Sequence, residues 1–379
     1  MRWLLSSLLL LGFLLSGCAS ELTAADSALG WRSTGLSFPN AKKTGGVHKV
    51  IAVGNTLFAM DAFTPDSAPA SRLNQWRLWK GRVGSLQWEQ LTLPEGDIPQ
   101  SWATDGSDLF VGTKYSGRLW SYSLGTMTWT KLALPLMPSV NDSQPYVHSI
   151  AVGDGQLFAG IGMNATSGSY CVSGEISGSL HQVPCVGVNR NITLDKLRFL
   201  DGNLYGIQYQ FGVFRFNVNA GTWDTLPSAW GPQGVKKDME MVSALGVHNG
   251  KIHVGFDGWW QGIFRWDDDH WTSLCPTSTD GKERVESAQT NYAIESFKGR
   301  LITAGSMGAA PTMQLSSETL KFGNWRIIDE NWTNALGESP PDTRDLLGVG
   351  DTLYAAGWYG LVKVPFDQLD KIARPMFKD

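Results

Sequence analysis

The clearest pattern in the chain is a short turn followed by a bulky apolar pair, and it recurs along almost the whole sequence. Each copy places Gly, Asn, Asp or Lys in the turn and follows it with a pair such as Leu-Phe or Leu-Tyr. The first apolar residue recurs every 47 to 52 residues, at Leu57, Leu109, Leu157, Leu204, Ile252, Leu301 and Leu353. A repeat of about fifty residues with hairpin chemistry inside each unit is typical of a β-propeller.

Each repeat reads as four strands. An apolar strand such as residues 50–53 precedes the turn, and the apolar pair begins the second strand. A third strand alternates, as in residues 118–122, and a fourth carries a Trp and a closing Pro, as in residues 88–94. Proline suits an outer strand, where a missing N–H costs little. We therefore expect an all-β, seven-bladed β-propeller over residues 30–370, followed by a polar C-terminal tail over residues 371–379.

The last repeat lacks a fourth strand, because no Trp–Pro segment follows Val364. The missing pattern occurs at the other end of the chain, between Trp31 and Pro39. We therefore expect the N-terminal strand to close the last blade and cover an edge that would otherwise invite aggregation.

The first residues resemble the signal of a bacterial lipoprotein. Arg2 is followed by an apolar stretch that is too short to span a bilayer, and this ends in Leu15-Ser16-Gly17-Cys18, which resembles a lipobox. The resemblance implies a signal peptide over residues 1–17, a lipid on Cys18 and a flexible tether over residues 18–29. The alternative is an ordinary secretory signal with a chance cysteine. Since no Asp follows Cys18, sorting in a Gram-negative host favours the outer membrane.

Composition agrees with an exported β-protein. Charged residues make up 17% of the chain, and the net charge of −4 gives no support for nucleic-acid binding. Cys171 and Cys185 flank a Gly/Ser-rich stretch and are expected to form a disulfide in an oxidising compartment.

The repeat spacing resembles that of kelch-type propellers. The chain departs from that family, because most repeats lack the paired glycine that kelch units carry after the second strand. The resemblance therefore implies the fold and no particular activity.

Polar residues occupy one position in every repeat, nine residues before the key apolar residue. They are His48, Gln100, His148, Asp195, Ser243, Tyr292 and Arg344. This position starts each first strand, on the face that carries the longer loops, so we expect these side chains to ring the mouth of the central channel. The alternative is a solvated entrance with no specific partner.

Aromatic residues follow the second strand in several repeats. Trp259, Trp260 and Tyr359 are candidates for stacking on a sugar ring or holding a peptide side chain. The alternative is wedging between blades, which we expect for strand tryptophans such as Trp88 and Trp129.

Signals for catalysis, cofactors or metals are weak. Carboxylates in two loops, over residues 238–240 and 280–286, could serve acid–base chemistry, although solvated loop charge explains them more simply. Asp267-Asp268-Asp269 could suggest calcium, but its place in the repeat favours a plain turn. We therefore leave the catalytic residues unassigned and expect no cofactor and no metal.

These observations predict a lipid-anchored binding or scaffold protein of the bacterial cell envelope. Its loop-rich face would hold a protein partner or a glycan. The alternative is an envelope carbohydrate-active enzyme, of glycosidase or lyase type, with loop carboxylates at the channel mouth.

Overall fold

The computed structural model describes most of the chain beyond the N-terminal segment. The described residues are 31–37, 44–63, 75–135, 145–162, 169–186, 194, 196–208, 212–227, 242–256, 263–274, 291–305, 312–315, 325–328, 343–357 and 360–375. Among them, no helix is long and apolar enough to cross a membrane.

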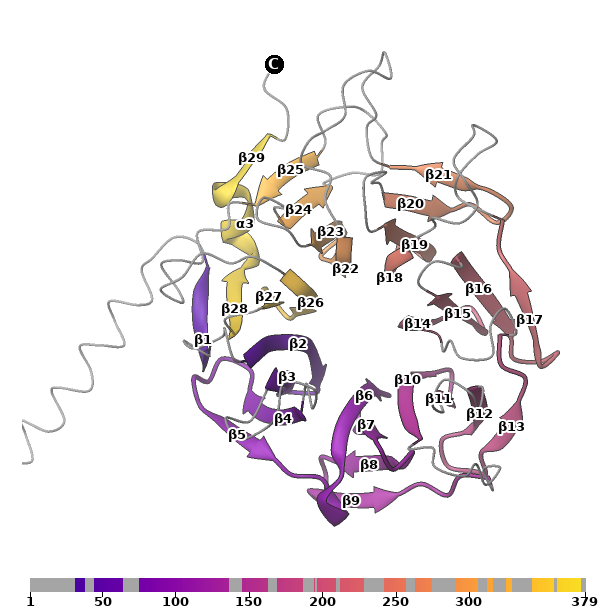
Figure 1. The fold of residues 1–379 in the computed structure, drawn as a ribbon. Helices are drawn as coiled ribbons and strands as arrows, with labels where there is room; N and C mark the ends of the chain where they lie inside the picture. The colour runs from indigo at the N-terminus through magenta and orange to yellow at the C-terminus, as the bar shows by residue number, and fades with distance from the viewer. Residues whose placement is uncertain are drawn as a thin grey trace, which may run out of the picture.

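Within these residues, the strands form seven antiparallel sheets arranged in a ring around a central axis (Figure 1). Six sheets have four strands, as each repeat predicts, and one has five. The protein is therefore an all-β β-propeller, in which each sheet is a blade.

The strands follow one order in each blade, from the axis outward (Figure 1). The innermost strands are β2 (Thr44–Val53), β6 (Ile98–Thr104), β10 (Tyr146–Gly153), β14 (Lys196–Leu200), β18 (Val242–His248), β22 (Asn291–Phe297) and β26 (Thr343–Val349). The second strands are β3 (Thr56–Phe63), β7 (Asp108–Lys114), β11 (Gln156–Gly162), β15 (Asn203–Gln208), β19 (Lys251–Phe256), β23 (Arg300–Gly305) and β27 (Thr352–Gly357).

The third strands are β4 (Gln75–Arg82), β8 (Leu119–Ser123), β12 (Ser169–Glu175), β16 (Gly212–Asn217), β20 (Ile263–Trp266), β24 (Thr312–Leu315) and β28 (Gly360–Pro365). The outer strands are β5 (Trp88–Leu91), β9 (Thr128–Lys131), β13 (His181–Val183), β17 (Thr222–Thr225), β21 (Trp271–Ser273), β25 (Trp325–Ile328) and, from the N-terminus, β1 (Arg32–Ser37). A short 3-10 helix, η1 (Pro94–Gly96), links the first two blades.

The repeated apolar pair lies between neighbouring blades. Consecutive strand residues point to opposite faces of a sheet. Leu109 accordingly packs in the core that β7 shares with the first blade, whereas Phe110 packs in the core shared with the third. Both side chains are almost completely buried. In six repeats the pair contributes to two inter-blade cores in this way, which explains why it recurs; the fifth repeat has Ile252 followed by the buried His253.

The turn before the pair has the backbone conformation that its residues favour. Asp154 and Gly155 have φ values of 53° and 73°, as a tight hairpin of this kind requires. Asp, Asn and Gly tolerate such angles better than other residues do. The local turn chemistry and the hairpin it joins therefore agree.

Outer-strand tryptophans join each blade to the preceding one. The Trp88 indole donates a hydrogen bond to the carbonyl oxygen of Thr34 (2.9 Å), and the Trp223 indole donates to that of Pro184 (2.8 Å). Trp129 packs in the core shared by the first two blades. The predicted structural role of these residues is confirmed.

The N-terminal strand closes the last blade, as predicted. β1 pairs antiparallel with β28, and the Thr34 hydroxyl donates to the Leu361 carbonyl oxygen at 2.8 Å. Trp31 and Leu36 are buried on either side of that bond. The two ends of the chain therefore meet in one sheet.

The prediction of a polar tail from residue 371 is wrong. Helix α3 (Phe366–Ile372) buries Leu369, and Ile372 packs against the same core. Strand β29 (Ala373–Pro375) then pairs with β25 and gives that blade its fifth strand. The apolar packing of α3 thus places β29 beside β25, the outer strand of the sixth blade in the four-strand repeat.

The predicted disulfide is confirmed. Cys171 in β12 and Cys185, which follows β13, are bonded, and their Cα atoms lie 5.4 Å apart. The bond joins the outer strand of the third blade to the strand beside it.

Candidate functional site: the channel and its mouth

The polar position of the repeat coincides with a structural irregularity. Six of the seven innermost strands contain a β-bulge near their start, where one residue has no partner on the second strand. In each of them the register skips the predicted polar residue. These residues are His48, Gln100, His148, Ser243, Tyr292 and Arg344. A bulge re-aims the side chain of the extra residue, so the repeat sets these six side chains apart from the regular alternation.

Two of the bulge residues meet directly. The Arg344 guanidinium lies 2.8 Å from His48 Nδ1, although the two residues are 296 positions apart. The His48 ring also contacts Trp76 edge to face, with ring centroids 4.8 Å apart. All three side chains are half-buried. The structure therefore brings His48 and Arg344 together where the last blade meets the first.

The other bulge residues make contacts with their own neighbours. His148 Nδ1 lies 3.1 Å from the Leu194 carbonyl oxygen at the start of the next blade. Ser243 is buried, and its hydroxyl lies 3.5 Å from the Gly255 carbonyl oxygen. Gln100 and Tyr292 are half-buried. The predicted ring is thus a set of equivalent positions, two of which, His48 and Arg344, are in direct contact.

The remaining predicted residues fall outside the described part of the chain. They are Cys18, Asp195, Trp259, Trp260 and Tyr359. The two loops with candidate acid–base carboxylates, over residues 238–240 and 280–286, also lie outside it. Their roles stay predictions.

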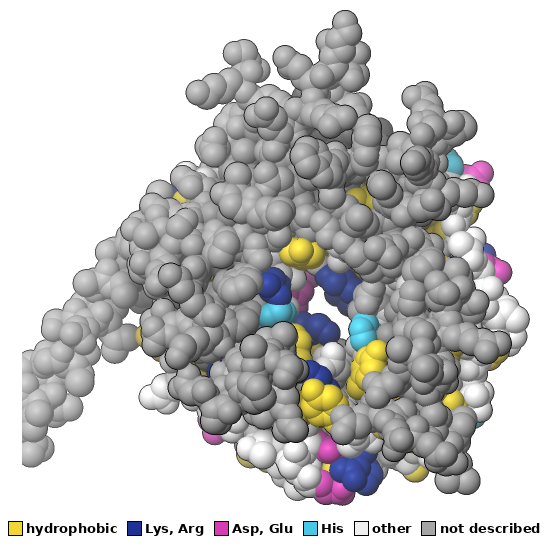
Figure 2. Space-filling model, in the orientation of Figure 1, with side chains coloured by type: hydrophobic (Ala, Val, Ile, Leu, Met, Phe, Trp, Pro, Cys, Tyr) yellow, Lys and Arg dark blue, Asp and Glu magenta, His cyan; other side chains and the backbone are white. Residues whose placement is uncertain are grey.

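Charged residues of the inner strands are the part of the site that the repeat pattern missed. Figure 2 shows an opening at the centre of the ring, which we call the channel, lined by Lys, Arg and His side chains and a few hydrophobic ones. Besides Arg344, which the repeat pattern identified, the charged residues on these strands are Lys49, Lys196, Arg198, Glu295 and Asp345. A charge within an otherwise apolar strand was the signal that could have identified them.

One lysine reaches far from its own blade. Lys196 starts β14, and its ammonium group contacts the carbonyl oxygen of Tyr292 in β22, two blades further along the ring. The innermost strands therefore approach one another closely enough at this level for a single side chain to bridge them.

Two carboxylates tie inner strands to the next blade. Glu295 Oε1 accepts a hydrogen bond from the Gly348 backbone N–H at 2.9 Å, and Asp345 Oδ2 accepts one from the Val50 N–H at 3.0 Å. Both side chains keep partial access to solvent. They belong to consecutive blades, and the charge of Asp345 acts on Glu295.

Both carboxylates hold their protons more tightly than usual. Burial raises the pKa of Glu295 to about 7, while the Gly348 N–H and the Arg198 guanidinium oppose that rise. Burial likewise raises the pKa of Asp345. The hydrogen bond from the Val50 N–H and the charges of Lys196, Arg198 and Lys49 act in the opposite direction and lower it. Perturbed carboxylates beside cations are common at functional sites, so the channel interior becomes part of the candidate site.

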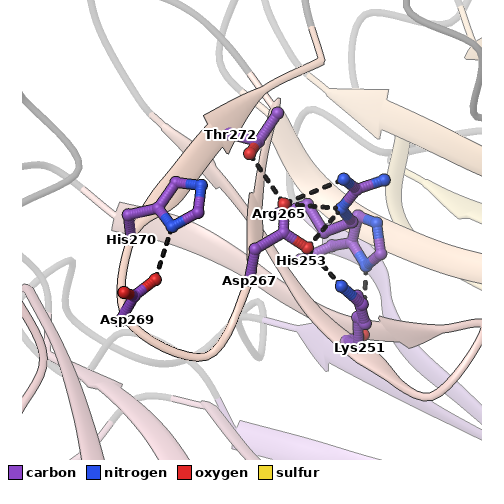
Figure 3. A network of polar contacts seen from close by, with 7 residues as sticks. All are labelled: Lys251, His253, Arg265, Asp267, Asp269, His270 and Thr272. Carbon is purple, nitrogen blue, oxygen red and sulfur yellow. Dashed lines mark hydrogen bonds and ion pairs between the residues drawn. The ribbon is translucent and has the colours of Figure 1, made fainter.

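A second charged cluster lies in the fifth blade and has a different character (Figure 3). The Asp267 carboxylate accepts hydrogen bonds from Arg265 Nη2 (2.8 Å) and the Thr272 hydroxyl (2.7 Å), and it contacts the Lys251 ammonium. The Arg265 guanidinium is the largest cause that holds the pKa of Asp267 far below its usual range. The backbone N–H of Asp267 donates to the His270 carbonyl oxygen at 2.9 Å, which closes the turn.

This cluster gives no support for a calcium site. No group of three or more His, Cys, Asp or Glu side chains among the described residues could hold a metal ion. The acidic run that starts at Asp267 forms a turn, as its place in the repeat predicts. The Asp267 carboxylate is bonded to Arg265 and Lys251.

Comparison with known proteins supports the fold alone. No known protein family matches the chain, and no curated protein matches it in sequence. Solved structures do match, at low identity. Virginiamycin B lyase from Staphylococcus aureus is 12% identical with a TM-score of 0.54, over 84% of this chain and 94% of the lyase.

Two further propellers match to a similar degree. The WD40 β-propeller domain of Doa1 is 12% identical with a TM-score of 0.54, over 89% of this chain and 96% of that domain. YCF48, solved bound to a D1 peptide, is 13% identical with a TM-score of 0.53, over 89% of this chain and 95% of YCF48. The chain is therefore similar in fold to propellers of several kinds.

Proposed function

We propose that this protein is a lipid-anchored binding or scaffold protein of the bacterial cell envelope, which holds a protein partner or a glycan at the channel mouth. The observation that carries the proposal is the set of bulges that places a polar side chain at the same point of six inner strands. Extra residues that break strand pairing persist where they re-aim side chains for a purpose. YCF48, a similar propeller solved with a peptide, supports a protein partner by analogy of fold.

The anchor is supported by the sequence and by the position of the first strand. Cys18 ends a segment that resembles a lipobox. β1 is the outer strand of its blade, so a tether from the membrane would join the ring at its rim and leave the channel mouth unobstructed. Stable anchoring requires more than one acyl chain, as bacterial lipoproteins carry, and the outer membrane is the proposed location.

Substitution of Cys18 tests the anchor. A Cys18→Ser protein should remain unprocessed and take up no labelled diacylglycerol, whereas the wild type takes up label and stays with the membrane fraction. Equal labelling of the two proteins would remove the anchor from the proposal.

Partner capture tests the binding surface. Affinity purification from envelope membranes with the anchored wild type should recover a partner, and a His48→Ala/His148→Ala/Arg344→Ala variant should recover at least tenfold less. A Lys131→Ala variant, changed on the outer strand β9, is the matched control and should capture normally. Equal capture by all three proteins would contradict the proposed surface.

A second candidate function is an envelope carbohydrate-active enzyme of glycosidase or lyase type. The observation in its favour is Glu295, whose pKa of about 7 suits proton transfer near neutrality, beside a second carboxylate, Asp345. It ranks second because each carboxylate already accepts a hydrogen bond from a backbone N–H of the next blade, which indicates a structural role. Turnover of envelope glycans by the wild type, lost in Glu295→Gln, would establish the enzyme; no turnover would exclude it.

A further inference from the structure

We propose that the channel interior is an anion-binding site, which takes one small oxyanion group, a carboxylate, phosphate or sulfate, between Lys49, Lys196 and Arg198. The inference goes beyond partner capture at the mouth, because it concerns other residues, lies inside the ring and requires neither the anchor nor an envelope protein.

Cations from opposite parts of the ring act on one carboxylate. Lys49 belongs to the first blade, while Lys196 and Arg198 belong to the fourth. All three are close enough to act electrostatically on a single carboxylate, Asp345 of the last blade. Arg198 also acts on Glu295 of the blade before it. The topology thus places charged side chains from four blades around one channel, where they act on the same carboxylates.

Among the described residues of the innermost strands, the balance of charge is positive, although the chain as a whole carries −4. Lys49, Lys196, Arg198 and the adjacent Arg344 face two carboxylates, Glu295 and Asp345. Burial raises the pKa of Glu295 to about 7, so this carboxyl is partly protonated near neutral pH. The cations on the described inner strands also outnumber the two carboxylates there. Cations within low-dielectric walls concentrate anions strongly.

The chemistry of the cations suits an oxyanion. Lysine offers a compact ammonium and arginine a planar fork of N–H donors, and both bind carboxylate and phosphate oxygens through charge-assisted hydrogen bonds. Arg198 is exposed, with a guanidinium bond to the Leu197 carbonyl oxygen that engages only part of its donor set. It is thus the cation best placed to meet an entering ligand.

Lys196 extends across part of the channel. Its ammonium group contacts the carbonyl oxygen of Tyr292, two blades further along the ring. A free anion or the acidic tip of a larger molecule would fit beside this side chain more readily than the body of a macromolecule. The two sources share the same oxyanion chemistry.

Titration of the full anchored protein in neutral detergent tests the site. The probes are citrate and inorganic phosphate as free anions, a hexaglutamate peptide as an anion borne on a chain, and glycerol as the uncharged comparison. We expect saturable heat of binding and a raised Tm with citrate or phosphate, and none with glycerol. Tighter binding of the peptide would identify a partner-borne acidic group as the source. No saturable binding of any anionic probe would overturn the proposal.

Matched variants locate the site. Arg198→Gln should weaken anion binding at least tenfold, and Lys196→Met should do the same where its Tm shows that it is folded. Arg82→Gln removes the same charge from an exposed position on β4, away from the innermost strands, and should bind as the wild type does. Equal affinity of Arg198→Gln and the wild type would overturn the proposed site.

The pH dependence supplies an independent readout. Arg198, Asp345 and the Gly348 N–H surround Glu295, and a bound anion adds negative charge that favours its protonated form. Binding near pH 7 should therefore take up protons, and affinity should fall several-fold between pH 6 and pH 8. His48 and His148 are further titratable groups on the innermost strands, so Glu295→Gln should reduce this dependence without abolishing it. An unchanged proton uptake in Glu295→Gln would contradict the arrangement.

Comparison of the two experiments on the anchored wild type separates this inference from the proposed function. Anion binding with no partner recovered would contradict the binding function and leave the channel site intact. Partner capture with no anion binding would contradict the channel site alone.

Discussion

The charged cluster around Asp267 and the charged channel contain the same kinds of residue in opposite electrostatic states. In the first, Arg265, Lys251 and Thr272 bond the carboxylate, and its pKa is far below the usual range. In the channel, cations act on Asp345 from nearby, yet burial still raises its pKa. The comparison shows that proximity of opposite charges is insufficient. Burial is the largest cause of the pKa shift at Asp345, and the bond from Arg265 is the largest at Asp267, so the balance of burial and direct bonds decides whether a carboxylate stabilises the fold or costs stability.

The two clusters therefore have different roles in our account. The outer parts of the blades contribute to stability through satisfied bonds and shared cores. The channel retains charges that are unfavourable for folding, which is typical of residues kept for binding or catalysis. Substitutions in the outer parts of the blades should therefore change stability, whereas substitutions in the channel should change binding.

Removal of the N-terminal strand should have the largest effect on stability. Deletion of residues 19–39 removes β1 with the buried Trp31 and Leu36, and it exposes the edge of β28. The free energy of unfolding should fall by roughly 4 kcal/mol or more, with aggregation. Deletion of residues 19–28 alone should be nearly silent. Urea unfolding of the two proteins checks this; equal stabilities would contradict closure by β1.

Loss of Asp267 should destabilise the fold without affecting capture. Asp267→Ala leaves Arg265 and Lys251 without their shared carboxylate, at a cost of about 2 kcal/mol in urea unfolding. Asp269→Ala is the matched control, since Asp269 is 86% exposed, and it should change stability by less than about 0.5 kcal/mol. A similar loss of stability in both variants would show that the cost arises from the place of the residue in the turn and not from the bonds of Asp267.

The contribution of Asp267 should also depend on pH. Its folded-state pKa is lowered, so its stabilising contribution is present above the pKa of the unfolded chain, near 3.8, and is lost as pH falls further. The difference between the wild type and Asp267→Asn should therefore shrink below about pH 4. A difference that is constant from pH 7 to pH 3 would contradict the assigned bonds.

Glu295→Gln should change the free energy of unfolding in the opposite direction to Asp267→Asn. A carboxyl whose pKa is raised in the folded state binds its proton more tightly there than in the unfolded chain. Wild-type stability should therefore fall as pH rises from about 4.5 to about 7 and then level off. Glutamine keeps an oxygen for the Gly348 N–H and carries no charge, so the variant should be more stable than the wild type by about 3 kcal/mol at pH 8. The gain should vanish near pH 4.5, and a gain independent of pH would contradict the raised pKa.

The bulge residues should have the smallest effect on stability. His48, His148 and Arg344 are half-buried, and the triple alanine variant should lose only about 1 kcal/mol in thermal unfolding while it loses capture. Asp267→Ala should show the reverse combination. A triple variant that unfolds as readily as Asp267→Ala would indicate a structural role for the mouth.

The sequence predicts the architecture because the repeat is local. Turn residues such as Asp154 and Gly155 and the alternation of Leu109 and Phe110 encode hairpins and inter-blade cores within a few positions. Strand β29 escaped prediction because three residues carry no periodicity, and its pairing with β25 depends on how α3 packs.

The candidate site was only partly predictable. The recurring polar position identified the bulge residues, since a fixed offset from Leu57 or Leu353 can be counted. The bulges themselves depend on strand register, and the contact of His48 with Arg344 joins residues 296 positions apart. Lys49 and Lys196 act on Asp345 because the ring closes and places their strands around one channel. No local pattern in the sequence indicates this arrangement.

Site-specific photo-crosslinking at the two ends of one blade tests the central claim most directly. A photoreactive residue would replace either Gln100, at the bulge of β6, or Thr130, exposed on the outer strand β9, in the anchored protein within envelope membranes. We predict a discrete crosslinked partner or glycan from position 100 and none from position 130. Crosslinks from position 130 with none from position 100 would show that this propeller binds through its rim, and would contradict the account.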